Sequence, residues 1–457
     1  MTKLKCDQIA VIGLDGASFN ILNLFLDDLP TYKKLLSEGS YGDLVSVDPP
    51  ATYGAWTTMF SSLNPGRHGY HNTVNLTKNY EIKPYYADSG YRIYNDLDKP
   101  ILINLPASYP RKSKKGGHLI HSWFCPSKEK AFPKEMQNWR EYKQYLFGAV
   151  SSNALQKIYF PSLIKKFRSI EKRRFILAKR LYEEYDFDLF FVLFNTVDWA
   201  MHELSRTLYP LEQCLSEIKL LWKDLDMYLS WFLNHFDDVL IVSDHGFQKI
   251  EQVVLLNSYL QKEGLLNLKK KHDVKTQFLR GSYIEKIDFD RTHAFCFDPY
   301  GSIFLNDQRY SKGGIVLEKR HEYEIRIKEK LLELNDQLDG RVLTDVKIKE
   351  KLYYGSKMEY LPDLYVRMKP GISADFTTFN EDNFLLPAEE VTPYRIGPLK
   401  AKTYQHKREG LWIAYGDRFK KQNNYTAQIA DIGATILCYY NVKPSEIIDG
   451  VPLKVLK

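Results

Sequence analysis

The chain has 457 residues, of which 44% are hydrophobic and 26% charged, which is the composition of a folded soluble protein of one or more domains. Its formal net charge of +7 is modest, and the lysine clusters at 111–117 and 268–275 are not interleaved with aromatic residues, which argues against a nucleic-acid-binding surface. The five cysteines are scattered without C-x-x-C spacing, which argues against a disulfide framework and against a thiolate zinc site.

The N-terminal apolar segment meets Asp15 too early to be a secretory signal. No apolar run approaches the ~20 residues that a membrane-spanning helix requires. We therefore expect a soluble, cytoplasmic protein without a membrane span. The sequence gives no indication of its oligomeric state.

Residues 1–264 alternate helical patterns with short, almost fully apolar runs. Such runs are typical of strands buried on both faces, and their alternation with helices predicts an α/β fold with a mainly parallel sheet sandwiched by helices. In chain order we expect a strand at 8–16, a short helix at 29–40, a strand at 99–110, helical segments between 133 and 186, a strand at 188–195, a helix at 225–236 and a strand at 237–246.

Residues 265–395 have a different character. This stretch is lysine-rich, with short predicted strands at 301–306 and 362–368 and a charged helix near 319–338. We interpret it as a cap or substrate subdomain inserted into the core. The core resumes in residues 396–457, with a strand at 411–416 and a closing helix at 425–440.

Polar side chains cluster where the predicted core strands end or begin. Singly, each has an ordinary explanation: a helix cap, a surface pair at i and i+4, or a loop histidine. In a parallel sheet, however, ligands bind beyond the carboxyl ends of the strands. Imidazole and carboxylate donors without thiolate suit zinc, with manganese or iron as alternatives, and a seventh donor, Thr52, makes the set large enough for two metals. The residues alone thus indicate a two-metal hydrolase built on Asp15, Asp198, His202, Asp244, His245 and His406.

Seven segments carry a resemblance that spans nearly the whole chain: "VIGLDGAS" (11–18), "PPATYGAWTTMFSSLNPGRHG" (49–69), "NLPASYP" (104–110), "VDWAMHEL" (197–204), "VSDHGF" (242–247), "YQHKREGLWIAYG" (404–416) and "ADIGATIL" (430–437). With this ordered set the chain resembles the alkaline phosphatase superfamily, and within it the type I phosphodiesterase/nucleotide pyrophosphatase family. It departs from the family at Ser61-Ser62, where relatives usually have Thr-Gly.

The resemblance implies two divalent metal ions, most simply zinc. It assigns one metal to Asp198, His202 and His406. The other would be held by Asp15, Asp244, His245 and the hydroxyl of Thr52.

The resemblance also makes Thr52 the nucleophile, which would form a phosphothreonine intermediate. A helix starting at Ala55 would present its N–H groups to the anionic phosphoryl group. The Gly-Arg-His-Gly loop (66–69) would fold back near the site, and Asn72 would bind a phosphate oxygen.

The implied substrate is a small phosphodiester or pyrophosphate, such as a nucleotide. A phosphomonoesterase or phosphotransferase acting at the same site is the nearest alternative. A non-catalytic scaffold on a hydrolase fold is a further alternative, which the seven potential ligands disfavour. A sulfatase is not expected, because the sequence has no C-x-P-x-R segment.

Overall fold

The computed structural model describes residues 8–84, 90–109, 116–122, 125, 130–143, 159–205, 207, 209–270, 275–277, 283–391 and 403–457. The chain divides into two compact units. We call Met1–Asn64, Tyr86–Phe247 and His406–Lys457 the core unit, and Pro65–Tyr85 with Gln248–Gln405 the second unit.

A large sheet forms the centre of the core unit. Within the described residues it has nine strands, in the order β22-β2-β21-β9-β1-β8-β5-β6-β7. The five strands from β9 to β6 are mutually parallel, while β21 runs antiparallel between β9 and β2. The mainly parallel sheet is therefore confirmed. The strands are β1 (Ile9–Leu14), β2 (Ser40–Val45), β5 (Ile101–Leu105), β6 (His118–His121), β7 (Ala131–Phe132), β8 (Leu189–Phe194), β9 (Asp238–Val242), β21 (Glu409–Gly416) and β22 (Ala427–Gln428).

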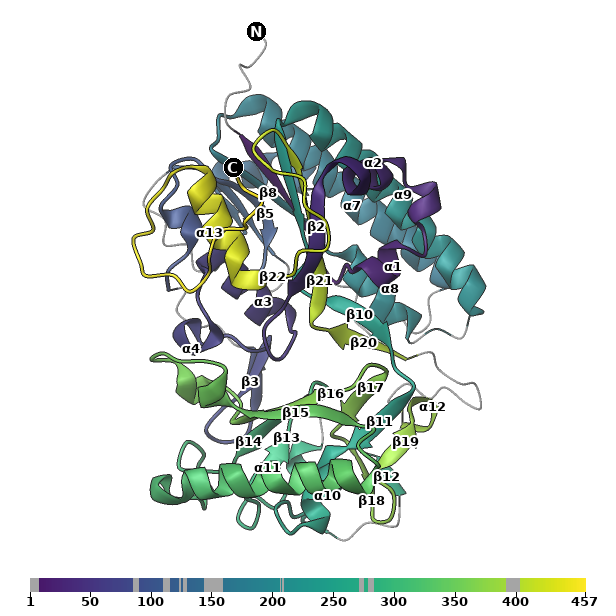
Figure 1. Ribbon diagram of the computed structural model, residues 1–457, viewed down its shortest axis with the longest axis vertical. Helices are drawn as coiled ribbons and strands as arrows, with labels where there is room; N and C mark the ends of the chain where they lie inside the picture. The colour runs from purple at the N-terminus through teal and green to yellow at the C-terminus, as the bar shows by residue number, and fades with distance from the viewer. Residues whose placement is uncertain are drawn as a thin grey trace. The chain divides into compact units, whose positions relative to one another are not determined.

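Helices cover both faces of this sheet (Figure 1). The central strands β1, β8 and β9 are buried at every residue, which explains their apolar sequences. On one face α3 (Thr52–Ser61) packs against α13 (Ile429–Tyr439), the predicted closing helix. The other face carries α2 (Pro30–Glu38), α7 (Phe160–Glu184), α8 (Thr196–Leu204) and α9 (Leu211–His235).

The second unit is built from short strands and a long helix. Its largest sheet has the order β13-β14-β16-β15, and α11 (Arg320–Gln337), the predicted charged helix, packs against it. The strands are β3 (Val74–Leu76), β4 (Ile82–Pro84), β11 (Gln252–Leu255), β12 (Lys275–Gln277), β13 (Ala294–Cys296), β14 (Ser302–Leu305), β15 (Leu343–Ile348), β16 (Leu364–Met368), β17 (Ile372–Asp375), β18 (Thr378–Asn380) and β19 (Leu385–Pro387), and the remaining helices are α4 (Pro65–His68), α10 (Leu256–Lys262) and α12 (Ala388–Val391).

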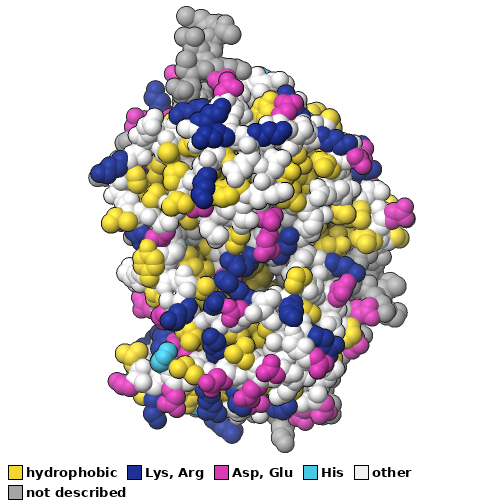
Figure 2. All heavy atoms as spheres, viewed as in Figure 1, with side chains coloured by type: hydrophobic (Ala, Val, Ile, Leu, Met, Phe, Trp, Pro, Cys, Tyr) yellow, Lys and Arg dark blue, Asp and Glu magenta, His cyan; other side chains and the backbone are white. Residues whose placement is uncertain are grey.

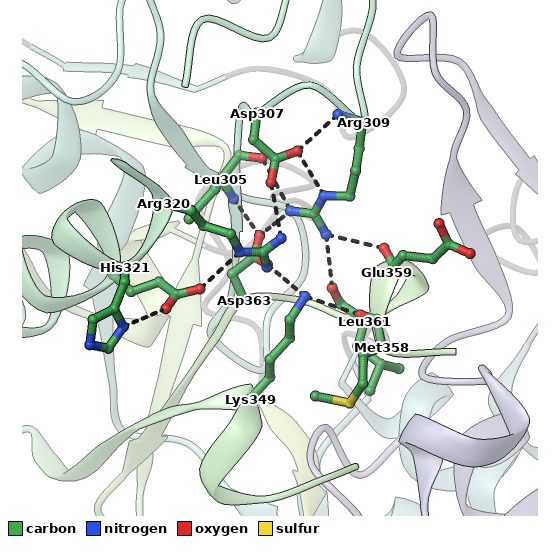
Figure 3. Close-up of polar contacts among 11 residues, drawn as sticks. Leu305, Asp307, Arg309, Arg320, His321, Lys349, Met358, Glu359, Leu361 and Asp363 are labelled. Atoms are coloured by element: carbon green, nitrogen blue, oxygen red, sulfur yellow. Dashed lines mark hydrogen bonds and ion pairs between the residues drawn. The ribbon is translucent and has the colours of Figure 1, made fainter. Parts of the chain in front are cut away.

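A buried carboxylate, Asp363, joins several segments of the second unit (Figure 3). It accepts hydrogen bonds from Arg309 and Arg320, and from the Lys349 ammonium group at 2.9 Å. Burial opposes its ionisation, but the neighbouring cations, Arg309 foremost, hold the pKa of Asp363 well below its usual range. Through these hydrogen bonds Asp363 links α11 and the segment after β15, and it also accepts the backbone N–H of Leu305 in β14.

Two local expectations near Thr52 were wrong. The helix begins at Thr52 itself and not at Ala55. Ala51 is the last residue with an extended backbone, and the buried Gly54 lies within the first helical turn. The Gly-Arg-His-Gly stretch is not an open loop, since Pro65–His68 forms the short helix α4, in which proline occupies the first position that helices tolerate well.

Residues 111–115 and 271–274 of the lysine clusters, residues 144–158 of the predicted helical segment, and Cys6 lie outside the described residues. None of the four described cysteines forms a disulfide bond. Among the helices of the described ranges, none has the length and apolar character needed to cross a bilayer. Lysine and arginine side chains are intermixed with acidic ones over the face shown in Figure 2.

Candidate functional site

The sheet topology brings the predicted ligands to one edge. Asp15 directly follows β1, α8 follows β8 and carries Asp198, and Asp244 lies just beyond β9. These three strands are parallel, so their carboxyl ends share one edge. His406, in β20 (Tyr404–Lys407), precedes β21, and because β21 is antiparallel its amino end lies at that same edge.

The ring of His245 lies at the centre of one group of donors. Its Nε2 atom is 3.3 Å from Asp244 Oδ2 and 3.6 Å from Asp15 Oδ1. The hydroxyl oxygen of Thr52, the first residue of α3, is 3.5 Å from the same nitrogen. Asp198 Oδ1 lies 4.0 Å from it, which links this group to the next.

A second group forms around Asp198. His406 Nε2 lies 3.2 Å from Asp198 Oδ1, and His202 Nε2 lies 3.4 Å from the same oxygen. The two imidazole nitrogens are 3.0 Å apart. The rings of His406 and His245 are stacked with centroids 3.7 Å apart, so the two groups are adjacent. All seven predicted ligands therefore lie together in the core unit.

Two backbone carbonyls determine the tautomers of the buried imidazoles. His406 Nδ1 lies 2.8 Å from the carbonyl oxygen of Pro50, and His245 Nδ1 lies 3.3 Å from that of Gly246. A carbonyl can only accept, so each Nδ1 carries the hydrogen and each Nε2 directs a lone pair into the site. Burial, reinforced at His245 by the charge of His406, lowers the pKa of both rings, which favours the neutral form that binds metals.

The three aspartates present oxygens that lack hydrogen bonds. Asp15, Asp198 and Asp244 are buried, and Asp15 Oδ1, Asp198 Oδ1 and Asp244 Oδ2 accept no hydrogen bond. A buried carboxylate oxygen without a donor is costly. Divalent cations satisfy such oxygens, and neutral imidazoles complete a donor set suited to zinc. The residues therefore fit the metal ions that the family resemblance implies.

The pKa values of the carboxyl groups reflect this crowding. Burial, followed by the charges of Asp244 and Asp198, raises the pKa of Asp15 well above its usual value. Burial and the charge of Asp198 likewise raise the pKa of Asp244. At Asp198 burial acts in the same direction, but His202 and His406 outweigh it and lower the pKa. A cation beside Asp15 and Asp244 would therefore favour their ionised forms, which burial and the neighbouring carboxylates disfavour.

Two sets of donor atoms could each hold a metal ion. Asp198, His245 and His406 form one set, and Asp15, Asp244 and His245 form the other, with the donor atoms of each set within 4.8 Å of one another. A family model, "Type I phosphodiesterase / nucleotide pyrophosphatase", matches residues 9–385 of this chain. The chain belongs to this family. It is therefore a phosphohydrolase of the phosphodiesterase/nucleotide pyrophosphatase type.

Solved structures share the fold of this family member. Murine ectonucleotide pyrophosphatase/phosphodiesterase 5 is 12% identical, with 97% of each chain covered and a TM-score of 0.52. An inactive variant of that murine protein, with a threonine-to-alanine substitution and in complex with AMP, gives a TM-score of 0.50 at 12% identity, again with 97% of each chain covered. Phosphonoacetate hydrolase from Sinorhizobium meliloti 1021, in complex with phosphonoformate, is 13% identical with a TM-score of 0.55, and 97% of this chain and 96% of that chain are covered. A comparison with curated proteins gave no match.

Supporting residues of this phosphohydrolase were not identified from the sequence. Gly16, with φ of +71°, donates its N–H to Asp244 Oδ1 at 3.2 Å, and a Cβ there would lie 2.7 Å from the ring of Phe247. Ser243 accepts the N–H of Ala17 at 2.9 Å and donates to the carbonyl of His245 at 2.6 Å. Ser243 and Phe247 both lie in the motif "VSDHGF", but only the fold gives them a supporting role.

Asn72 belongs to the second unit, unlike the other predicted site residues. Its Oδ1 atom accepts the backbone N–H of Thr73 at 2.7 Å and lies 3.2 Å from the Thr73 hydroxyl. Its assignment to a phosphate oxygen stays a prediction.

Proposed function

We propose that this protein is a two-metal phosphohydrolase that cleaves a nucleotide-like phosphodiester or pyrophosphate through a phosphothreonine intermediate on Thr52. The observation that carries the proposal is the convergence of three unpaired buried carboxylate oxygens with imidazole lone pairs beside one threonine hydroxyl.

The donor groups suggest how two divalent ions are divided. Asp198, His202 and His406 would hold one ion. The other would be held by Asp15, Asp244, His245 and Thr52. Zinc suits this mixture of carboxylate and imidazole best, and manganese is the alternative. Such ions lower the pKa of a bound hydroxyl and neutralise the oxygens of a phosphoryl group.

The position of Thr52 supports the proposal that it is the nucleophile. It is the first residue of α3, and Ala51 before it supplies no side-chain cap, so a phosphoryl group bound at Thr52 would lie at the positive end of the helix dipole. The Thr52 oxygen attacks phosphorus in line, forming a Thr–O–P bond as the bond to the leaving oxygen breaks. Water then cleaves the Thr–O–P bond, releases the phosphate product and regenerates the hydroxyl.

The solved structures add support for the nucleophile and for the substrate class. In the murine protein a single threonine-to-alanine substitution gives an inactive enzyme that binds AMP. A threonine nucleophile and a nucleotide substrate are therefore natural choices for this family member also.

Matched substrates provide the test. We expect zinc-loaded protein to hydrolyse bis-p-nitrophenyl phosphate faster than p-nitrophenyl phosphate. A strong preference for the monoester would overturn the diesterase assignment in favour of a phosphomonoesterase or phosphotransferase. Metal analysis addresses the scaffold alternative, because about two equivalents of metal after gentle purification support the enzyme and none supports a non-catalytic protein.

A further inference from the structure

A buried ion pair on α7 contacts the start of α8, the helix that carries Asp198 and His202. Glu171 and Arg174 are one helical turn apart and are 0% and 1% exposed. The two side chains contact each other directly. Both also reach the start of α8, because Glu171 Oε1 accepts the backbone N–H of Thr196 at 2.9 Å and Arg174 donates to Asn195 Oδ1 at 3.0 Å.

The first residues of α8 depend on these contacts. Asn195 occupies the N-cap position, where an asparagine usually accepts an N–H from its own helix. Its side chain makes no such cap, and its Oδ1 accepts from Arg174 instead. The acceptor for the helix start is therefore supplied from α7 by Glu171, and a carboxylate at a helix N-terminus also interacts favourably with the helix dipole.

The energetics favour a role beyond general stability. A fully buried ion pair loses the hydration of both charges, and an apolar pair of similar volume is often equally or more stable. The helices already have apolar contact through Phe167 and Trp199, whose rings are 5.7 Å apart. What an apolar pair could not provide is the acceptor for Thr196 N–H, since the first N–H groups of a helix have no acceptor within it.

The helix held in this way carries two predicted ligands. Asp198 and His202 are the third and seventh residues of α8, and the nearest of them is two residues from Thr196. We propose that Glu171, with Arg174 as its buried counterion, is a positioning residue, which fixes the start of α8 so that Asp198 and His202 are preorganised for a metal ion. The part of this inference that concerns the metal ion rests on the proposed function. The part that concerns the placement of α8 does not.

Two double variants isolate the hydrogen-bond acceptor. Glu171→Leu/Arg174→Met removes the acceptor and leaves no unpaired charge. Glu171→Gln/Arg174→Met also removes both charges but keeps an amide oxygen that can accept the Thr196 N–H. Arg168→Met/Asp224→Leu is the matched control, because it deletes an ion pair between α7 and α9, with N–O distances of 2.6 and 3.0 Å, whose hydrogen bonds involve no residue of α8. If Glu171→Leu/Arg174→Met does not fold by circular dichroism, Glu171→Ala/Arg174→Ala replaces it.

The first measurement is amide hydrogen exchange on metal-free protein. We expect residues 196–204 to exchange faster in Glu171→Leu/Arg174→Met, and at the wild-type rate in the glutamine variant and in the control. This readout does not depend on the metal. Unchanged exchange in Glu171→Leu/Arg174→Met would overturn the proposed placement of α8.

The second measurement is zinc affinity, by competition with a chromophoric chelator. We expect one equivalent to bind as in the wild type and the other to bind about 10-fold or more weakly in Glu171→Leu/Arg174→Met, as for other groups that orient metal ligands. Wild-type affinity for both equivalents in that variant would refute the link to the metal. Failure of the wild-type protein to bind zinc would instead contradict the proposed function, and the exchange result would still decide the placement of α8.

Discussion

The Nε2 atoms of His202 and His406 lie 3.0 Å apart, although the two residues are separated by 204 positions in the sequence. At this distance both nitrogens cannot carry a hydrogen directed at the other. Both are 3.2–3.4 Å from the same oxygen of Asp198, so the three donor atoms face a common point. A cation at that point would be bound by all three.

We predict that His406→Ala removes the metal ion that we propose beside Asp198. The variant should retain about one equivalent of zinc by elemental analysis and lose about 100-fold or more of kcat/KM on a diester substrate, since a metal ligand should matter at least as much as the groups that orient it. His321→Ala is the control, because this histidine is 75% exposed in the second unit. Two tight equivalents in His406→Ala would contradict the ligand assignment.

We predict that Thr52→Ala lowers kcat by roughly three orders of magnitude or more, because the hydroxyl is the attacking group in the proposed mechanism. Thr52→Ser keeps a hydroxyl and should retain measurable turnover. Acid quenching during turnover, followed by mass spectrometry, should find phosphate on Thr52 in the wild type and none in Thr52→Ala. More than a tenth of wild-type activity in a clean preparation of Thr52→Ala would be incompatible with a nucleophilic role.

We predict that Asp244→Asn stabilises the metal-free protein while abolishing activity. The pKa of Asp244 is raised in the fold above its usual 3.8, so its contribution to stability is present below pH 3.8 and is lost as pH rises through the folded-state pKa. Asparagine keeps an oxygen for the Gly16 N–H but carries no charge. In chelator-treated protein at pH 8, the free energy of unfolding should therefore be about 1–3 kcal/mol higher in the variant.

The pH dependence distinguishes this effect from simple repacking. The stability difference between Asp244→Asn and the wild type should shrink toward pH 4, where the carboxyl is protonated in the fold. Urea unfolding at several pH values measures it. A difference that is the same at pH 4 and pH 8 would exclude the proposed electrostatic cause.

We predict that Asp363→Asn destabilises the second unit by about 3–5 kcal/mol, because it leaves buried cations without their counterion. The pKa of Asp363 is lowered in the fold, so its stabilising contribution is present above its usual value of 3.8 and is lost as pH falls below it. Asp290→Asn is the control, since Asp290 pairs with Lys312 on the surface, where such pairs contribute about 0–1 kcal/mol. Equal denaturation midpoints for the two variants would show that Asp363 is not a stabilising centre.

Much of the core could be predicted from the sequence because its strands are buried on both faces. The apolar runs that precede Asp15, Asp198 and Asp244 indicated parallel strands with a common edge, and the structure has that arrangement. His406 had the weakest signal of the set, since by itself it resembles a loop histidine: it precedes its strand and reaches the edge through the antiparallel direction of β21. Periodicity does not reveal the direction of a strand.

Ser62 illustrates a departure from the family that only the structure explains. It follows α3 in the left-handed conformation, with φ of 55°, which favours the glycine usual in relatives. Its hydroxyl donates to the carbonyl of Ala430 at 2.7 Å, and its own carbonyl accepts the N–H of Asp449 at 2.8 Å. These bonds to residues far along the chain offset the backbone strain, and no local pattern could have predicted them.

The order of strands has a consequence for synthesis of the protein on the ribosome. Within the described part of the chain, the sheet partners of β2 are β21 and β22, which are synthesised only after the intervening residues 46–408. Until then, both edges of this early strand lack their native partners and can pair with other nascent chains. His406 is synthesised just before β21, so the proposed metal site is expected to become complete only after this stretch has left the ribosome.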